Sequence, residues 1–231
     1  MVRVGALEGD LRDRLDDQIK RQARLMAALT SRPMQSTQDL AYWLEMVYRA
    51  DPASRQHCER VAMSAIRIAT EMGLGGGALG DLERAALVHD LGRWATVDPR
   101  TDSSAILPGT AQDRLNQARV AGDILSVVPL LEPAGELIAA SFEWYDGSGF
   151  PEGLSARAIP LGARVLAVAD AADTLAVLCL ALHHPLDMVR DELIRSAGTR
   201  FDPEVVAVWL QTSDRDAQSV TIWGAALPTL H

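Results

Sequence analysis

The sequence predicts an all-α fold. Apolar residues recur three or four positions apart over most of the chain, which is the spacing of the buried face of a helix. Glycine or proline lies at most of the boundaries between these stretches. Alternation typical of a strand occurs only around residues 219–223. We therefore expect a helical bundle, with helices over 38–48, 54–72, 79–91, 111–126, 133–144, 161–182, 186–197 and 203–211.

An additional amphipathic helix is predicted near the N-terminus, over 10–29. Its apolar stripe is heptad-like but only about two heptads long, so it suits either packing on its own domain or pairing in a homodimer. Pro33 follows this helix, and Ser36 with Asp39 has the pattern of a capping box at the start of the next one. The predicted organisation is an N-terminal helix and linker in 1–35, a helical domain in 36–212 and a C-terminal tail in 213–231.

The composition favours a globular protein of the reducing cytoplasm. Apolar residues make up 48% of the 231 positions, and the only cysteines, Cys58 and Cys179, are too few for a disulfide framework. The net charge of -9 argues against binding to a nucleic-acid polymer, because phosphate backbones are bound by clustered Lys and Arg. No apolar run is long enough for a membrane span, and Gly75 to Gly77 read as a flexible turn.

Two histidines and two aspartates lie at positions that helices are expected to bury. His89 and Asp90 end an apolar helix, His57 lies in the first turns of another, and Asp170 interrupts a run of Val, Leu and Ala. An inward carboxylate is costly unless a cation compensates its charge. Two imidazoles and two carboxylates form a plausible ligand set for one divalent ion of Mn, Fe, Zn or Mg.

The same residues carry a resemblance to a known family. Their order, His57, then His89-Asp90, then Asp170, resembles the pattern of the HD superfamily of metal-dependent phosphohydrolases. The stretch from Glu143 to Pro151 is similar to the HHExxDGxGYP loop of the HD-GYP branch, with Phe in place of Tyr, and the resemblance covers roughly 45–210. It implies an HD-domain-like helical bundle that hydrolyses cyclic di-GMP with the help of metal ions.

The chain departs from the family at the positions that would hold a second metal. Ala118 and the pair Ser141-Phe142 stand where the family places histidines. A cation cannot replace three lost imidazoles by water without a large loss of affinity. We therefore expect one metal ion at most, held by His57, His89, Asp90 and Asp170.

The resemblance also suggests residues for the substrate. Asp90 and Arg93 are the predicted catalytic residues, and Arg93 stands in place of a phosphate-contacting lysine. Arg93 suits either a bidentate contact to phosphate or the capping of helix carbonyls. Gly147, Gly149 and Pro151 either shape a tight loop or let backbone amides approach a phosphate.

The first prediction for function is a divergent HD-GYP-like signalling domain. It would bind one divalent metal and a cyclic dinucleotide, with weak or lost phosphodiesterase activity. The first alternative is a competent single-metal phosphohydrolase that acts on a nucleotide or another phosphate ester. The second is a metal-free interaction module.

Overall fold

The computed structural model describes residues 20, 27, 34, 36–48, 52–92, 111–126 and 128–218. The predicted helix over 10–29, apart from Lys20 and Ala27, therefore lies outside the described residues, as do Arg93 and the strand-like segment at 219–223.

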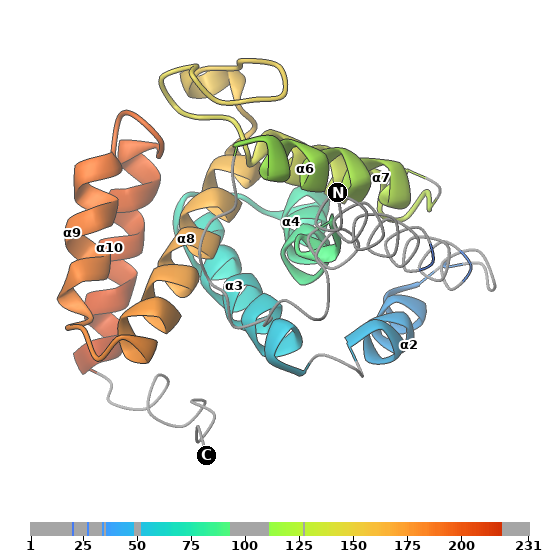
Figure 1. The fold of residues 1–231 in the computed structure, drawn as a ribbon, viewed down its shortest axis with the longest axis horizontal. Helices are drawn as coiled ribbons and strands as arrows, with labels where there is room; N and C mark the ends of the chain where they lie inside the picture. Colours follow the sequence, from blue (N-terminus) through green and yellow to red (C-terminus); the bar gives the residue numbers. More distant parts are fainter. Residues whose placement is uncertain are drawn as a thin grey trace, which may run out of the picture.

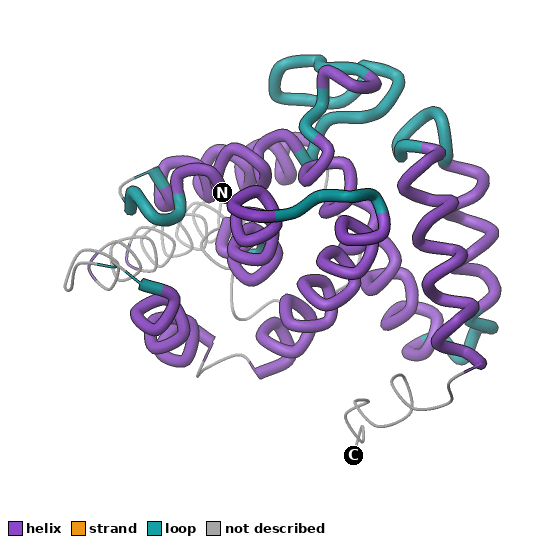
Figure 2. Tube along the Cα trace, turned by 180° about the vertical axis from the view of Figure 1, so that it is seen from behind, coloured by secondary structure: helices purple, strands orange, loops and turns teal. Residues whose placement is uncertain are grey.

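The described part of the chain is helical, which confirms the predicted fold class (Figure 1). Eight α-helices and one short 3-10 helix occur there, and Figure 2 shows no strand in it. Their bounds are α2 Thr37–Tyr48, α3 Pro52–Glu71, α4 Gly76–Val88, α6 Ala111–Leu125, α7 Glu132–Ala140, η1 Ala156–Ala158, α8 Leu161–Ala181, α9 Asp187–Ser196 and α10 Pro203–Gln218.

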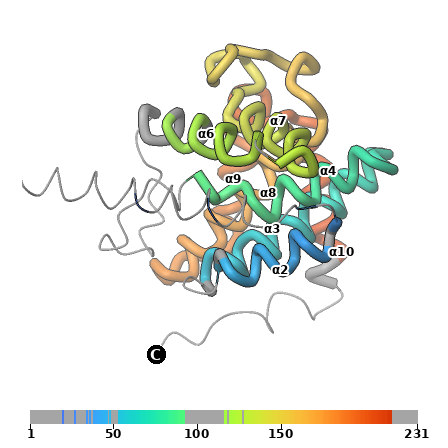
Figure 3. Tube along the Cα trace, turned by 90° about the vertical axis from the view of Figure 1, so that its right-hand side faces the viewer, coloured from blue at the N-terminus to red at the C-terminus, as the bar shows by residue number. Residues whose placement is uncertain are grey.

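Helices α3, α4 and α8 form the centre of the bundle. Helix α3 packs against both α4 and α8, and α7 packs against α4, α6 and α8. Ile68, Leu82 and Leu166 are fully buried between these helices. Helices α9 and α10 form an antiparallel pair on one side (Figure 1), where Arg190 and Asp214 form an ion pair of 2.5 Å. In Figure 3, α6 and α7 lie above α3, α4 and α8.

Most helix boundaries agree with the sequence within two residues, and four ends do not. Helix α4 begins at Gly76, so Gly76 and Gly77 belong to its first turn, and the prediction of a flexible turn across all three glycines was wrong. Helix α4 also ends at Val88, before the residues that carry the chemistry. Helix α7 ends at Ala140, and α10 continues past the predicted end at Gln211.

The predicted capping box at the start of α2 is confirmed. The Asp39 backbone N–H donates to the Ser36 hydroxyl at 3.3 Å, and the Ser36 backbone N–H donates to the Asp39 carboxylate at 3.1 Å. Each side chain thus accepts a hydrogen bond from the other residue's backbone N–H. This matters because the first N–H groups of a helix have no acceptor within the helix.

The loop between α7 and α8 is anchored from two directions. The Tyr145 N–H donates to the Arg200 carbonyl at 3.2 Å, and the Asp146 N–H donates to the Thr199 carbonyl at 2.9 Å. Arg164, in the first turn of α8, pairs with the buried Asp202. These contacts fix the loop, drawn in yellow at the top of Figure 1, to the segment that precedes α10.

Gly92 lies where the chain after α4 meets α6. A Cβ atom at this position would overlap the backbone carbonyl of Gln117, and it would stand 3.2 Å from the Cβ of Ala121. The close approach of the two segments therefore requires glycine. Because Gly92 follows His89 and Asp90 by a few residues, this contact also fixes the turn that carries them.

We expect Gly92→Ala to lower the free energy of unfolding by about 1 to 3 kcal/mol, because the backbone of α6 must move away. Gly122→Ala is the matched control, since Gly122 lies in α6 and a Cβ there meets open space. This control should raise stability by about 0.5 to 1 kcal/mol. Chemical denaturation of both variants measures the difference, and equal effects would contradict the close contact.

Candidate metal centre

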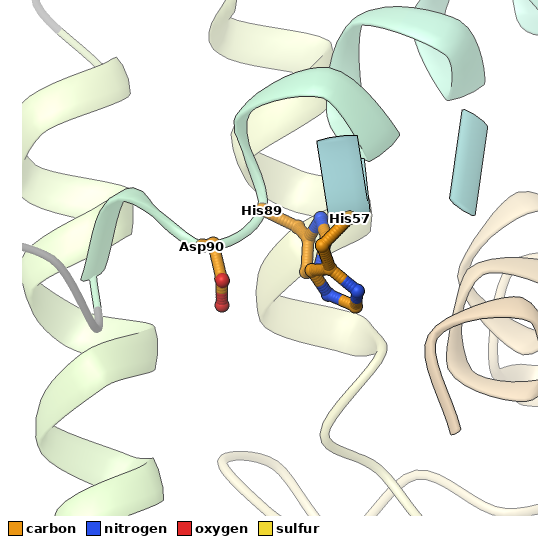
Figure 4. Close-up of side chains that lie close together, drawn as sticks. All are labelled: His57, His89 and Asp90. Carbon is orange, nitrogen blue, oxygen red and sulfur yellow. The ribbon is translucent and has the colours of Figure 1, made fainter. Parts of the chain in front are cut away.

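Two imidazoles meet where the start of α3 approaches the end of α4. His57 lies in the second turn of α3, and His89 is the first residue after α4. Their Nε2 atoms are 3.2 Å apart, and the ring centroids are 5.1 Å apart (Figure 4). Both side chains are mostly buried, with 16% and 9% of their surfaces exposed.

The two predicted carboxylates lie at the same place. Oδ1 of Asp170, from the middle of α8, is 3.3 Å from the Nε2 of His57 and 3.5 Å from the Nε2 of His89. One oxygen of Asp90 lies within 4.8 Å of a ring nitrogen of each histidine. The four side chains predicted as metal ligands are therefore brought together from three separate segments of the chain.

The second nitrogen of each ring is held by a protein acceptor. Nδ1 of His57 is 2.7 Å from the Asp173 carboxylate, and Nδ1 of His89 is 2.8 Å from the backbone carbonyl of Ala86. A histidine that donates through one nitrogen presents the other to a ligand. Both Nε2 atoms are therefore turned toward each other and toward Asp170.

Asp173 and Arg60 were not assigned from the sequence. Asp173 is 3% exposed and receives two hydrogen bonds from the Arg60 guanidinium, at 2.7 and 2.8 Å, besides its contact with His57. The available signal was the spacing, because Asp173 follows Asp170 by three positions and Arg60 follows His57 by three, which places each pair on one helix face. The guanidinium of Arg60 neutralises the charge of Asp173 and fixes this carboxylate as the acceptor that orients His57.

The buried charges shift one another's proton affinities. Burial acts to lower the pKa of His57, but the hydrogen bonds with Asp170 and Asp173 outweigh it and raise the pKa to about 10. The pKa of His89 is also raised well above its usual value against the effect of burial, because Cys58 and Asp170 lie beside it. Burial alone would raise the pKa of Asp170, yet the two imidazoles hold it well below its usual range.

The donor atoms have the spacing that a small divalent cation needs. Bonds of about 2.1 Å to nitrogen and oxygen place neighbouring ligand atoms about 3.0 to 3.4 Å apart. The triangle formed by the two Nε2 atoms and Oδ1 of Asp170 has sides of 3.2, 3.3 and 3.5 Å. The residues therefore fit one cation. Asp170 keeps 39% of its side chain exposed, which leaves the donors accessible from its side.

The positions of the absent histidines serve other contacts. The Ser141 hydroxyl donates to the Ile138 carbonyl at 2.7 Å, which closes the end of α7. The Phe142 ring stacks on Phe150 with centroids 5.9 Å apart. Ala118 lies in α6. The candidate ligand atoms of His57, His89 and Asp90 all lie within 4.8 Å of one another.

The glycines of the α7–α8 loop have structural roles. Gly147 has a φ of +86°, and a Cβ at Gly149 would overlap the backbone N of Trp144. Both observations support the interpretation that these glycines shape a tight loop. Pro151 is exposed, and contact of these residues with a substrate stays a prediction.

Comparisons with known proteins give consistent matches. A family described as HD domain matches residues 42–205. A cyclic di-GMP phosphodiesterase of Thermotoga maritima is 30% identical over 165 residues, which cover 70% of this chain and 45% of the relative. The cyclic di-GMP phosphodiesterase response regulator RpfG of Xanthomonas campestris pv. campestris is 31% identical over 196 residues, which cover 81% of this chain and 51% of the relative. The chain thus spans about half the length of these curated relatives.

A solved structure supports the same fold. The cyclic GMP-AMP specific phosphodiesterase V-cGAP3 of V. cholerae superimposes with a TM-score of 0.57 at 21% identity, covering 74% of this chain and 47% of that one. At this identity the likeness concerns the fold alone. No helix in the described part of the chain is both long enough and apolar enough to cross a membrane.

We expect metal uptake to release protons. A ligand nitrogen must be deprotonated, and His57, with a pKa of about 10 in the metal-free chain, carries a proton at neutral pH. The apparent affinity should therefore increase about tenfold per pH unit for each proton released, over about pH 6 to 8. Calorimetric titration with Mn²⁺ in buffers of different ionisation enthalpy counts these protons. A count of zero would contradict protonated imidazoles at this site.

We expect Asp173→Asn to weaken metal binding, because the amide cannot keep both the Arg60 pair and the orientation of His57. The affinity for Mn²⁺ should fall by about 10- to 100-fold. Asp214→Asn is the control, since it breaks an exposed ion pair that contributes less than about 1 kcal/mol. Chelator competition measures the affinities and thermal denaturation the stabilities. Unchanged affinity in a folded Asp173→Asn variant would refute the orienting role.

Proposed function

Since the chain belongs to the HD domain family, we propose that it is a divergent HD-GYP-like signalling domain. It binds one divalent cation and a cyclic dinucleotide, and its phosphodiesterase activity is weak or lost. The observation that carries this proposal is the triangle of donor atoms from His57, His89 and Asp170, whose sides suit a single cation.

The proposed ligands of the cation are His57, His89, Asp90 and Asp170. When bound, a divalent cation polarises a phosphoryl oxygen and makes water more acidic. Two neutral imidazoles and two carboxylates cancel its charge, so this effect is smaller than at a site made of imidazoles alone. The protein contributes a fixed set of donors, because both Nδ1 atoms are already held by Asp173 and by the Ala86 carbonyl.

Asp90 is the proposed catalytic residue within this set. Asp90 or Asp170 would accept the proton of the water molecule that attacks phosphorus, while the bond from phosphorus to the ester oxygen breaks. Arg93 follows three positions later and is the predicted ligand of a nonbridging phosphate oxygen, although it lies outside the described residues. An arginine suits this role because its planar guanidinium can make two parallel hydrogen bonds to phosphate.

The phosphodiesterase activity is proposed to be weak because the chain lacks the histidines that would hold a second metal ion. A pair of cations steadies both the attacking and the leaving oxygen, and one cation cannot do so. Ser141 and Phe142 have no imidazole to offer a second cation. The Ser141 hydroxyl closes the end of α7, and the Phe142 ring stacks on Phe150. The chain therefore keeps the means to bind a charged ligand but lacks part of the means to cleave it.

The cyclic dinucleotide is proposed from the relatives. Two of them are named cyclic di-GMP phosphodiesterases, and the superimposed structure is named a cyclic GMP-AMP specific phosphodiesterase. The loop with Gly147, Gly149 and Pro151 is the proposed contact for the ligand phosphate, because glycines let backbone amides approach closely.

A competent single-metal phosphohydrolase is the alternative that one observation favours. With 39% of the Asp170 side chain exposed, a phosphate ester can reach the donors. This alternative shares the cation and its four ligands with the leading proposal. It differs in turnover and in its substrate, which is a nucleotide or another phosphate ester.

We expect purified protein to contain about one divalent metal ion per chain, because four ligands are present for one cation. Asp90→Ala should lose it, whereas Asp123→Ala, an exposed change in α6, should keep it. Elemental analysis measures both variants. An absence of metal in the unmodified protein, even after incubation with Mn²⁺, would refute the proposal and favour a metal-free interaction module.

The same proteins separate the two catalytic alternatives. Incubation with cyclic di-GMP, 3′3′-cGAMP, bis-p-nitrophenyl phosphate and p-nitrophenyl phosphate tests turnover, and calorimetry tests binding of the dinucleotides. Binding without product above the Asp90→Ala background supports the proposed function. Efficient turnover that disappears in Asp90→Ala and persists in Asp123→Ala would establish the single-metal phosphohydrolase instead.

A further inference from the structure

The hydroxyl of Tyr48 touches both of the elements that carry the histidines. Tyr48 is the last residue of α2 and is 2% exposed. Its hydroxyl donates to the backbone carbonyl of Leu87 in the last turn of α4, at 3.2 Å. The same oxygen is 3.4 Å from the Sγ of Cys58 in α3.

Both contacts lie close to the histidines along the chain. Cys58 is the neighbour of His57, and its Sγ is also 3.8 Å from the Nδ1 of His89. Leu87 precedes His89 by two positions. One buried hydroxyl is therefore placed between the two segments whose separation sets the distance between the two imidazoles.

The contact with Leu87 also holds the end of a helix. The last carbonyls of an α-helix lack partners within the helix. In α4, two consecutive carbonyls of this kind are filled by side chains, Ala86 by the ring of His89 and Leu87 by the hydroxyl of Tyr48. The turn that presents His89 is thus fixed once by its own imidazole and once by α2.

We propose that Tyr48 is a positioning residue that sets the separation and orientation of His57 and His89 for cation binding. This inference rests on the proposed function, because it assigns Tyr48 a role toward the same cation. Helix α2 otherwise meets the bundle through apolar side chains such as Leu40 and Trp43 and through an exposed ion pair between Glu45 and Arg55. Through the contacts of Tyr48 with Cys58 and Leu87, the position of α2 can affect the two imidazoles.

The test compares Tyr48→Phe with Tyr42→Phe. Phenylalanine keeps the ring and removes only the hydroxyl, and Tyr42, in the same helix, is 58% exposed. Co²⁺ is the probe, because its visible spectrum reports ligand geometry. Its affinity, from chelator competition, should fall about tenfold in Tyr48→Phe. The spectrum should shift, and Tyr42→Phe should match the unmodified protein.

A second readout does not require the metal. In ¹⁵N-labelled, metal-free protein, the signal of the His89 Nδ1 proton should shift or exchange faster in Tyr48→Phe. Leu193→Ala, in the buried face of α9, is the control for general loss of stability. It should lower the melting temperature without changing the cobalt spectrum or the His89 signal.

The outcomes separate this inference from the proposed function. If the unmodified protein binds no Co²⁺, the proposed function fails, and the His89 signal still tests the role of Tyr48. If Tyr48→Phe binds Co²⁺ with unchanged affinity and spectrum, or if Leu193→Ala produces the same changes, the role of Tyr48 is refuted. Should Tyr48→Phe not fold, Cys58→Ala removes the contact on the α3 side, and an unchanged cobalt spectrum in that variant would equally refute it.

Discussion

The hydrogen bond between His57 and Asp173 joins α3 to α8 at the point where the four proposed ligands meet. Its importance comes from a general constraint, because an ionised side chain that leaves water must find compensating charge or hydrogen bonds. Arg60 compensates Asp173 within the bundle, so that carboxylate is satisfied by protein groups alone. Asp170 instead faces the imidazoles of His57 and His89. Where α3 packs against α8, the two carboxylates therefore differ in role. Asp173 is structural, and Asp170 is available to a cation.

Local pattern was sufficient to predict the helices. It also singled out four candidate ligands, whose side chains the fold brings close together. A buried helix face has a period that is visible in the residues, and His or Asp at inward positions stands out against apolar neighbours. The assignment of Asp173 and Arg60 required more. An acidic residue three positions after Asp170 looks like any polar residue on a helix until the partner helix is known, and that partner comes from more than 100 positions away.

The errors in helix ends have a similar cause. Glycine is a poor helix former, so Gly76 and Gly77 suggested a turn, but the first turn of a helix needs few internal hydrogen bonds and tolerates them. Helix α7 was predicted too long because its apolar pattern continues into Phe142. There the ring instead stacks on Phe150, and the buried Glu143 accepts a hydrogen bond from the Glu152 N–H at 2.6 Å. Contacts between residues of one loop decided the end of the helix.

The anchoring of the α7–α8 loop affects the thermodynamics of any ligand that reaches it. Hydrogen bonds from Tyr145 and Asp146 to the segment before α10, together with the pair of Arg164 and Asp202, fix the backbone of the loop in advance. Ordering a mobile loop on binding costs conformational entropy, and a loop that is already fixed avoids most of that cost. A partner of modest size can therefore bind this surface without first having to organise it.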